Sequence, residues 1–401
     1  MKDILLVSSD PPFKLFTGGD TQSEIILNFL SKRFKVTILF WEDNYNNRKI
    51  KILKKKIKKF NYIILKKKSL SYFEPIKNFI HFNPFGLELD NQTISLIKNF
   101  NYCFLYGSGP VFAFRNIHFV KKIVYNINPT IVSRLNINEN TTNFLRKLKG
   151  LLLKLYFNKV DKFYYKIVEQ ADFIITSMEL EFKKLNKIFK KKIIYLPMPH
   201  EDDYYSKKKL KGNSKITVVH TGHLQNSLTK ISLKWIGEMV MPLIIKLNLS
   251  KNFILLILGK GRPDRKIKKL FAGVQTRFLG HVSKEKYKKI LYNCDAYIFA
   301  AKYRIFAFIN RIESALSIPT SIVTTNELRK DFKFLKNNIH ILSNSNPKKF
   351  LENIIKLKNN EVLHKKLRRN ARNVYNKQFS PYVFEKKLDK FFNKNNIYQT
   401  T

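Results

Sequence analysis

The chain has 401 residues and is 44% hydrophobic, which is enough for two sizeable cores and predicts two domains of similar size. Its only cysteines, Cys103 and Cys294, exclude a disulfide framework and a cysteine metal cluster, in keeping with a reducing compartment. A net charge of +47 favours an anionic partner, which could be nucleic acid, a membrane surface or a phosphorylated substrate. AT-rich coding bias would explain most of this excess, because Lys, Asn, Ile, Phe and Tyr are abundant throughout.

The first expected strand covers residues 4–8, where a continuous apolar run is typical of a buried parallel strand. A loop then leads to Gly18 and Gly19 and to a helix with apolar residues at helical spacing. Glycines at a helix N-terminus let backbone N–H groups approach a negative ligand, so this pair is a candidate phosphate or acceptor loop. A plain tight turn would explain the pair equally well.

A lysine-rich segment follows the second expected strand, which covers residues 35–40. It runs from Lys51 to Lys68 and reads KILKKKIKKFNYIILKKK. Such a charge run is usually a solvated face. Its interleaved Ile, Leu, Phe and Tyr side chains could instead enter a membrane interface while the lysines meet anionic headgroups. The segment is therefore a candidate for contact with an anionic membrane surface.

Four further strands are expected before the middle of the chain. They lie at residues 102–106, 123–127, 173–177 and 193–197. The small-residue turn Tyr106–Pro110 follows the first of these strands and could line a cleft. A helical stretch at residues 144–172 mixes apolar residues with lysines and offers a second basic amphipathic surface.

Residues 199–215 lack an apolar core pattern and contain Pro199 and Gly212, which indicates a linker between domains. The expected domains are therefore residues 1–198 and 216–378, with a C-terminal helix at 379–401. The linker begins with His-Glu-Asp-Asp at residues 200–203. Clustered acids in a linker usually face water, so we predict no metal site there.

The second half is organised around residues 253–325, where three apolar runs alternate with helical stretches that end at glycine or small residues. This alternation is typical of βαβ units with buried parallel strands. Two more strands are expected at residues 217–222 and 340–343. Loops after the strands of an open α/β sheet are where ligands bind, so we expect half of any active site in this region.

The ordered series of motifs HTGHL, LLILGKG, FLGHV, CDAYIFAA and RIESALSIPT resembles the GT-B glycosyltransferases. Within them it is most similar to family 4, which retains anomeric configuration. The fit is best over residues 217–375, and the first half matches in outline only. The resemblance implies two Rossmann-like, doubly wound domains that face a cleft, with the C-terminal helix crossing back to the first domain. It also implies a nucleotide-sugar donor on the second domain and an acceptor facing the first.

The resemblance implies cations for the donor diphosphate after the HTG-like strand. The first matching position holds His223 instead of arginine, and the nearest lysine is the slightly displaced Lys230. Some relatives carry an Asn-Arg/Lys-Ile segment, which Asn310 and Arg311 match, so Arg311 could supply the missing permanent charge. Gly222 would add a backbone donor. The alternatives are that His223 only caps the strand end and that Lys230 is solvated.

Glu313 matches the second of the two family glutamates, which accepts hydrogen bonds from the ribose of the donor. A helix N-terminal acid favoured by the helix dipole is the alternative explanation for Glu313. Eight positions earlier stands Ile305 instead of glutamate, and the glycine expected before Pro319 is missing. The strand ends of the first domain carry no histidine to match the family's catalytic one, so no catalytic residue is assigned.

The resemblance therefore predicts a retaining, metal-independent transfer from a nucleotide-sugar to a lipid-linked or polysaccharide acceptor. Such a reaction serves surface glycan biosynthesis, for example of lipopolysaccharide, and needs no cofactor beyond the nucleotide-sugar substrate. The departures at Ile305 and Pro319 motivate an alternative, a catalytically impaired glycan-binding or partner protein. Nucleic acid binding rests on the charge alone. Because the chain has no run of 18 apolar residues and no signal-peptide pattern, we expect it to be cytoplasmic, or peripheral at the inner face of the cytoplasmic membrane.

Overall fold

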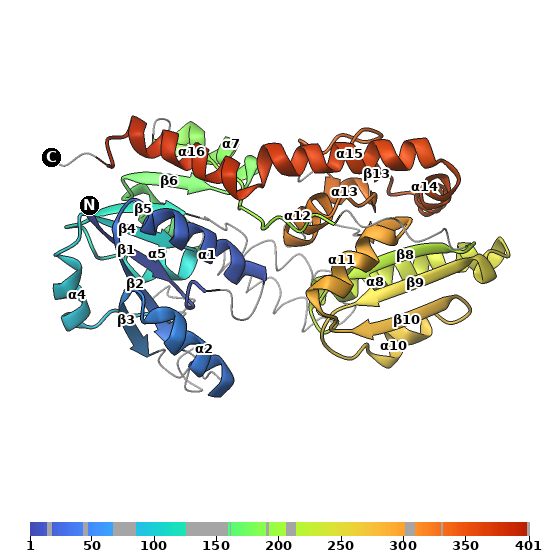
Figure 1. Ribbon diagram of the computed structural model, residues 1–401, viewed down its shortest axis with the longest axis horizontal. Helices are drawn as coiled ribbons and strands as arrows, with labels where there is room; N and C mark the ends of the chain where they lie inside the picture. The colour runs from blue at the N-terminus through green and yellow to red at the C-terminus, as the bar shows by residue number, and fades with distance from the viewer. Residues whose placement is uncertain are drawn as a thin grey trace. The chain divides into compact units, whose positions relative to one another are not determined.

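Two α/β units make up the chain (Figure 1). The computed structural model describes residues 1–13, 18–42, 47–66, 86–125, 159–160, 162–189, 192–205, 214–300, 309–329 and 332–398. The first unit comprises Met1–Pro199 and Phe384–Thr401, and the second comprises His200–Val383. Each unit is built on one parallel sheet flanked by helices, as the alternation of apolar runs and helical stretches predicts. Among the described helices, none is both long enough and apolar enough to span a bilayer.

The first sheet has seven strands in the order β3-β2-β1-β4-β5-β6-β7. Its strands are β1 (Asp3–Ser8), β2 (Lys35–Glu42), β3 (Asn61–Lys66), β4 (Tyr102–Tyr106), β5 (Lys121–Tyr125), β6 (Phe173–Thr176) and β7 (Ile193–Tyr195). All neighbouring strands pair in parallel. The central strands are buried on both faces because they are continuous apolar runs.

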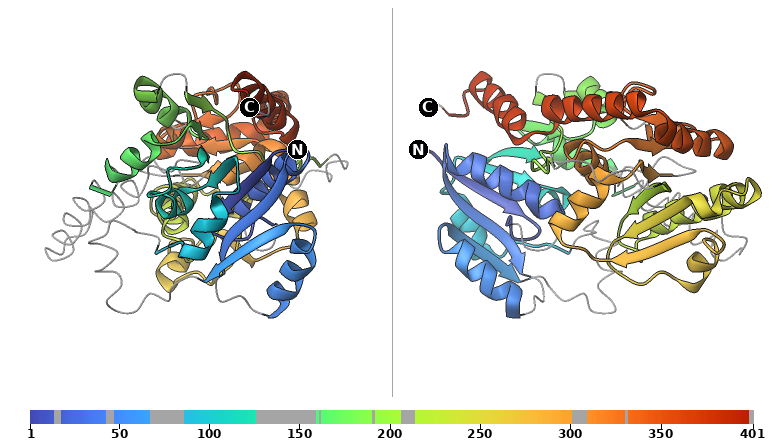
Figure 2. Two further views of the ribbon diagram at one scale, coloured as in Figure 1. Left: turned by 90° about the vertical axis from the view of Figure 1, so that its left-hand side faces the viewer. Right: turned by 45° about the vertical axis from the view of Figure 1, so that its right-hand side comes forward.

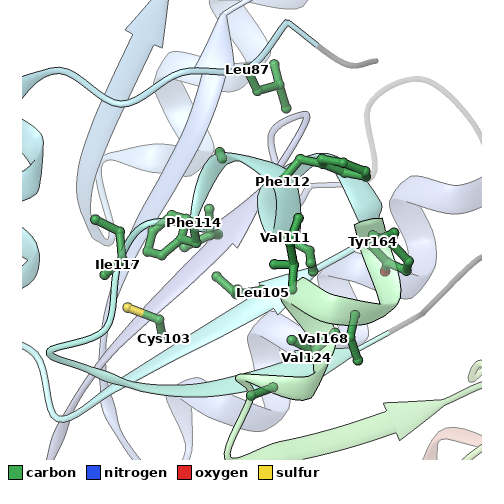
Figure 3. Close-up of a cluster of buried hydrophobic side chains, with 14 of the residues drawn as sticks. Leu87, Cys103, Leu105, Val111, Phe112, Phe114, Ile117, Val124, Tyr164 and Val168 are labelled. Atoms are coloured by element: carbon green, nitrogen blue, oxygen red, sulfur yellow. The ribbon is translucent and has the colours of Figure 1, made fainter. Parts of the chain in front are cut away.

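Helices cover both faces of the first sheet. They are α1 (Gly18–Ser31), α2 (Asn47–Ile57), α4 (Asn91–Ile97), α5 (Ser108–Ala113), α7 (Glu179–Phe189) and α16 (Pro381–Lys394). One core lies between the sheet and α1, α2 and α16. The opposite core is shown in Figure 3, where Leu105 of β4 lies near Val111 of α5, and Cys103 of the same strand lies on the side of Ile117. Burial in this apolar core raises the pKa of the Cys103 thiol, as expected for a structural cysteine.

The last helix of the chain, α16, packs into the first unit. Its residues Phe384 and Phe392 are fully buried and lie edge-on to the ring of Phe29 in α1. Arg33 donates two hydrogen bonds, of 2.5 and 2.6 Å, to the carboxylate of Asp389. The apolar face of α16 and this bidentate ion pair explain why the chain returns to the first unit at its C-terminal end.

The second sheet has six parallel strands in the order β10-β9-β8-β11-β12-β13. They are β8 (Ile216–Thr221), β9 (Phe253–Leu258), β10 (Gln275–Gly280), β11 (Ala296–Phe299), β12 (Ile322–Thr324) and β13 (Leu342–Ser343). The right-hand view of Figure 2 shows β9 and β10 side by side. The order reverses beside β8, because β9 lies on one side of it and β11 on the other. Open α/β sheets bind ligands at such switch points.

Helices also flank the second sheet. They are α8 (Ser227–Trp235), the π-helix η3 (Ile236–Val240), α9 (Met241–Lys246), the 3₁₀ helix η4 (Ser250–Asn252), α10 (Arg265–Lys269), α11 (Lys284–Asn293), α12 (Ile309–Ser317), α13 (Asn326–Arg329), α14 (Pro347–Asn359) and α15 (Glu361–Gln378). Asn346 caps α14 as its sequence predicts, since its side chain accepts a hydrogen bond of 3.1 Å from the backbone N–H of Lys349.

The lysine-rich segment contains more regular structure than its sequence suggests. It forms part of α2 and all of the edge strand β3, a strand that is not among those predicted from the sequence. The apolar run Tyr62–Leu65 is short and lies between lysine-rich stretches, as is common at the edge of a sheet. The expected helical stretch is described only from residue 159 onward, so its earlier part, like residues 126–127 of an expected strand, lies outside the described residues.

The acids expected to face water at the start of the linker instead bind cations of the second unit. Arg372 of α15 donates hydrogen bonds of 2.6 and 2.7 Å to the carboxylate of Asp202. Lys284 of α11 lies 2.7 Å from both Glu201 and Asp203. The expectation is wrong for Asp203, which is buried. These ion pairs hold residues 200–203 against the second unit, to which they belong.

Asp203 gives a pH-dependent contribution to stability. Burial alone would raise the pKa of its carboxyl group, but His200 and Lys284 outweigh burial and lower the pKa from 3.8 to about 2. The stabilisation is therefore complete above the unfolded-state pKa and is lost as the pH falls toward 2. Asp203→Asn should reduce the free energy of unfolding by about 1–2 kcal/mol at pH 7.

Urea unfolding at pH 7, 5 and 3 tests this expectation. The difference between wild type and Asp203→Asn should shrink at the lowest pH, where the wild-type carboxylate begins to protonate. Glu285→Gln is the matched control, because Glu285 is 76% exposed and lies 3.8 Å from Lys288. A difference for Asp203→Asn that is constant from pH 7 to 3 would contradict the assignment.

Candidate functional site

Two glycines bring the ends of three strands together at the carboxyl edge of the second sheet. Gly222 follows β8 and Gly259 follows β9, with φ angles of +148° and +145°. The N–H of Gly222 donates to the carbonyl oxygen of Leu258, and the N–H of Gly259 donates to that of Gly280 at the end of β10, both at 2.9 Å. Because its N–H is bound in this way, Gly222 does not offer the backbone donor that the sequence predicts. A Cβ on Gly259 would overlap the carbonyl oxygen of Gly222. Only glycine fits this junction, so the backbone itself forms the surface there.

The guanidinium group of Arg311 lies directly against Gly222. A Cβ on Gly222 would be 2.5 Å from both the guanidinium carbon of Arg311 and Oγ1 of Thr229. Arg311 comes from the first half of α12, and its Nη2 donates a hydrogen bond of 2.7 Å to Thr229 Oγ1 in α8. Burial lowers the pKa of Arg311, but arginine titrates far above neutrality and stays charged. The fold thus delivers a permanent cation to the end of β8.

Buried hydroxyl groups surround this cation. Thr221, the last residue of β8, is hydrogen-bonded to the hydroxyl of Tyr297 in β11. Ser314 of α12 donates a hydrogen bond of 3.3 Å to the hydroxyl of Tyr287 in α11. Burial raises the pKa of both tyrosines, so they remain neutral donors and acceptors. These hydroxyl groups surround the guanidinium group with neutral hydrogen-bonding partners.

The hydroxyl group of Ser232 in α8 makes hydrogen-bonding contacts with β8 and with the end of β11. Ser232 Oγ lies 3.0 Å from Nε2 of His220 in β8 and accepts a hydrogen bond of 3.1 Å from the N–H of Ala300, just beyond β11. Burial, aided by the charge of Arg311, holds the pKa of His220 well below its ordinary value, so this histidine is neutral. Thr229 and Ser232 lie three residues apart and therefore face the same side of α8. That face of α8 therefore binds Arg311 through Thr229 and the strand ends through Ser232.

The two other predicted cations lie in more open surroundings. Lys230 follows Thr229 in α8 and forms an ion pair of 2.9 Å with Asp264, with its side chain 37% exposed. His223 is exposed, and its Nδ1 accepts a hydrogen bond of 3.3 Å from the N–H of Gln225. The N-terminus of α8 begins beside them and is capped by Asn226. Both side chains are accessible from solvent near the carboxyl edge of the sheet.

The remaining predicted residues are distributed over both units. Glu313 lies in α12 two residues after Arg311 and is buried, with 1% of its surface exposed. Asn310 lies in the first turn of α12, where the structure describes only the backbone. Ile305 lies outside the described residues. Gly18 and Gly19 open α1 in the first unit. The structure thus brings Gly222 and Arg311 into contact, with Lys230 adjacent through Thr229.

Three residues of this arrangement were not singled out from the sequence. Thr229 and Tyr297 are an ordinary helix threonine and an ordinary strand tyrosine, and only the fold shows that they lie near Arg311. Gly259 did carry a signal, because the LGKG run places two glycines directly after a strand. A glycine at a strand end indicates close backbone approach.

The comparisons with known proteins agree with this architecture. Residues 215–360 match the family model for glycosyl transferases group 1. No curated protein matches the chain. The fold is similar to that of HepE from Anabaena in complex with UDP-glucose, with a TM-score of 0.63 and 8% identity over 98% of this chain and 100% of that chain. It is also similar to a glycosyltransferase from Rickettsia africae, with a TM-score of 0.61 and 16% identity over 98% of each chain. A TarM mutant from S. aureus in complex with UDP and glycans gives a TM-score of 0.62 and 13% identity over 98% of this chain and 100% of that chain.

The structural similarity covers both units, and the family match covers most of the second. Together they confirm the GT-B fold and the class of enzyme that the sequence motifs predict. We conclude that the protein is a glycosyltransferase of the GT-B fold, in which residues 215–360 match the model for glycosyl transferases group 1.

Proposed function

We propose that the protein transfers a sugar from a nucleotide-sugar to a lipid-linked or polysaccharide acceptor in surface glycan biosynthesis, with retention of anomeric configuration and without a metal ion. The observation that supports the donor class is the contact between the Arg311 guanidinium and Gly222 at the end of β8. A diphosphate needs permanent cations and backbone donors; Arg311 is the cation at this junction, and the N-terminus of α8, which follows Gly222 in the chain, would provide the donors. UDP is present in the HepE and TarM structures, so UDP-sugars are the first donors to test.

The departing diphosphate carries the charge that the site must stabilise. Arg311 would bind it from the buried side and Lys230 from the open side, after exchanging its ion pair with Asp264 for one with phosphate. The N-terminus of α8 adds partial positive charge. Because such preorganised groups need little reorganisation during the reaction, this electrostatic stabilisation is the largest expected catalytic contribution. The acceptor hydroxyl attacks on the face from which the diphosphate leaves.

Release of nucleoside diphosphate tests the proposed function. Purified protein should release it from one nucleotide-sugar of a panel, slowly with water and faster with a glycan or lipid-linked acceptor. The released product and the linkage formed can be followed by chromatography and NMR, which also reports the anomeric configuration. An inverted product would contradict retention, and a loss of turnover in EDTA would contradict metal independence. Failure to release nucleoside diphosphate from every sugar donor would overturn the function itself.

Glu313 is the proposed acceptor of hydrogen bonds from the ribose hydroxyls. A carboxylate can accept from two neighbouring hydroxyls at once, whereas an amide offers one oxygen. Glu313→Gln should therefore weaken nucleotide binding by about ten- to a hundredfold, as for the loss of a charged hydrogen bond. Isothermal calorimetry with the nucleoside diphosphate measures this change. Glu352→Gln on the exposed side of α14 is the control, and equal affinities for both variants would remove Glu313 from the site.

A lipid-linked acceptor is presented at a membrane. The proposed function therefore includes work at the inner, anionic face of the cytoplasmic membrane. The large positive charge of the chain supports such a location, because anionic headgroups attract lysine-rich surfaces.

A further inference from the structure

The edge strand of the first sheet exposes large apolar side chains. Tyr62 and Ile64 of β3 are 50% and 39% exposed. They pair in register with Ile38 and Phe40 of β2, so all four point to the same face of the sheet. Lys66 shares that face at the carboxyl end of β3 and is exposed. Strand β3 thus exposes Tyr62, Ile64 and Lys66 in alternate positions at the edge of this face.

The neighbouring helix adds lysines to the same surface. Leu53 and Ile57 pack in the core and so define the inner face of α2. Lys56 reaches back to α1, where its Nζ lies 2.6 Å from Glu24. Helical geometry places Lys54, and Lys58 just beyond the helix, on the opposite flank, which faces away from α1 and toward the β3 side of the sheet. Both lysines are exposed.

Charge and apolar exposure in this surface point to one kind of partner. From Asn47 to Lys66 the sequence holds nine lysines and arginines and no acid. Lysines alone are a common protection of a sheet edge, but half-exposed Tyr and Ile side chains oppose that role because they favour association. Lysines that surround exposed Tyr and Ile fit an anionic bilayer, where the lysines meet headgroups and the apolar side chains enter the interface. Nucleic acid would account for the lysines and could stack on Tyr62, but it gives no role to the exposed Ile64.

We propose that Lys54, Lys58, Tyr62, Ile64 and Lys66 form a surface, here called the β3 surface, that binds an anionic lipid bilayer. Lys66 ends β3 at the carboxyl edge of the first sheet, the edge at which open α/β sheets bind ligands. The β3 surface therefore places a bilayer next to the edge expected to receive the acceptor. This last step rests on the proposed function, whereas bilayer binding itself does not.

Vesicle co-sedimentation of the full chain tests the proposal. Wild type should bind vesicles of phosphatidylcholine with 30% phosphatidylglycerol and should bind pure phosphatidylcholine much more weakly. The double variant Tyr62→Ser with Ile64→Ser keeps the charge and should reduce binding to the anionic vesicles by about tenfold, because it removes the apolar contribution. Lys54→Ala with Lys58→Ala should also reduce binding and should weaken its dependence on salt.

Matched variants separate the β3 surface from the general charge of the chain. Ile245 and Leu247 lie at the end of α9 in the second unit and are 45% and 51% exposed, so Ile245→Ser with Leu247→Ser removes similar apolar surface elsewhere. Lys348→Ala with Lys349→Ala does the same for two exposed lysines of α14. Both controls should bind vesicles like wild type. Equal losses in the β3 and control variants would overturn the proposal, as would β3 variants that lose RNA binding and keep vesicle binding.

Two further measurements separate a loss of bilayer binding from a loss of folding or of catalysis. Thermal unfolding shows whether the serine variants remain folded. Release of nucleoside diphosphate in the absence of vesicles should be unchanged in the β3 variants, while transfer to an acceptor in vesicles should fall. If wild type releases no nucleoside diphosphate but the β3 variants alone lose vesicle binding, the proposed function fails and the β3 surface stands.

Discussion

Replacing Arg311 with methionine is expected to lower kcat/KM for the donor by about a hundred- to a thousandfold, the usual effect of removing one preorganised donor to a developing negative charge. Methionine retains most of the aliphatic length beside Gly222 but carries no charge and cannot donate to Thr229. The measurement is steady-state release of nucleoside diphosphate at several donor concentrations. Because the guanidinium would stabilise the leaving group more than the bound donor, kcat should fall more than KM rises.

Two variants make the Arg311 result specific. Arg369→Met changes an exposed arginine of α15 and should leave kcat/KM unchanged. Adding His223→Arg to Arg311→Met should restore part of the activity, since residue 223 is exposed and adjoins Gly222, against which the Arg311 guanidinium lies. A folded Arg311→Met variant that retains a third or more of wild-type kcat/KM would show that the diphosphate is bound elsewhere.

Among glycine-to-alanine substitutions in the second unit, Gly259→Ala should reduce the free energy of unfolding most. The added Cβ would overlap the carbonyl oxygen of Gly222, and alanine would also have to adopt a φ angle of +145°. Backbone strain and overpacking together predict a loss of about 2–5 kcal/mol in the free energy of unfolding. Urea unfolding followed by tryptophan fluorescence measures it, because Trp235 lies in α8 of the same unit.

Gly280→Ala is the matched control for that substitution. Gly280 also has a positive φ angle, +65°, but a Cβ there would meet no atom within 4 Å. Only the left-handed backbone cost of about 1–2 kcal/mol is then expected. If the two alanine variants were equally stable, the close approach of Gly222 and Gly259 would not be the feature that holds the strand ends together.

Much of the fold follows from the apolar runs of the sequence. Strand β4 covers Tyr102–Tyr106 as predicted, and β1, β2 and β8 differ from their predicted ranges by only one or two residues at an end. These strands are buried on both faces, so apolar residues dominate their interior positions. Strand β3 was missed because its short apolar run, Tyr62–Leu65, stands between lysine-rich stretches at the edge of the sheet.

The arrangement of the candidate site could be predicted only in part. The family motifs single out Gly222, Arg311 and Glu313, but no sequence pattern indicates that Arg311 binds Thr229, 82 residues earlier. The same limit applies to Asp203, which looks like a solvated linker acid until the fold brings Lys284 to it. Local periodicity predicts elements, whereas contacts between distant elements depend on the tertiary structure.

The most direct test of donor binding by the second unit is a thermal-shift screen of nucleotide-sugars, because a ligand that binds the native state raises Tm by mass action. One nucleotide-sugar is predicted to raise the Tm of the wild type by several degrees and to raise that of Arg311→Met and Glu313→Gln much less. A Tm that responds to no nucleotide-sugar but does respond to a glycan, or that responds equally in all three proteins, would contradict this assignment.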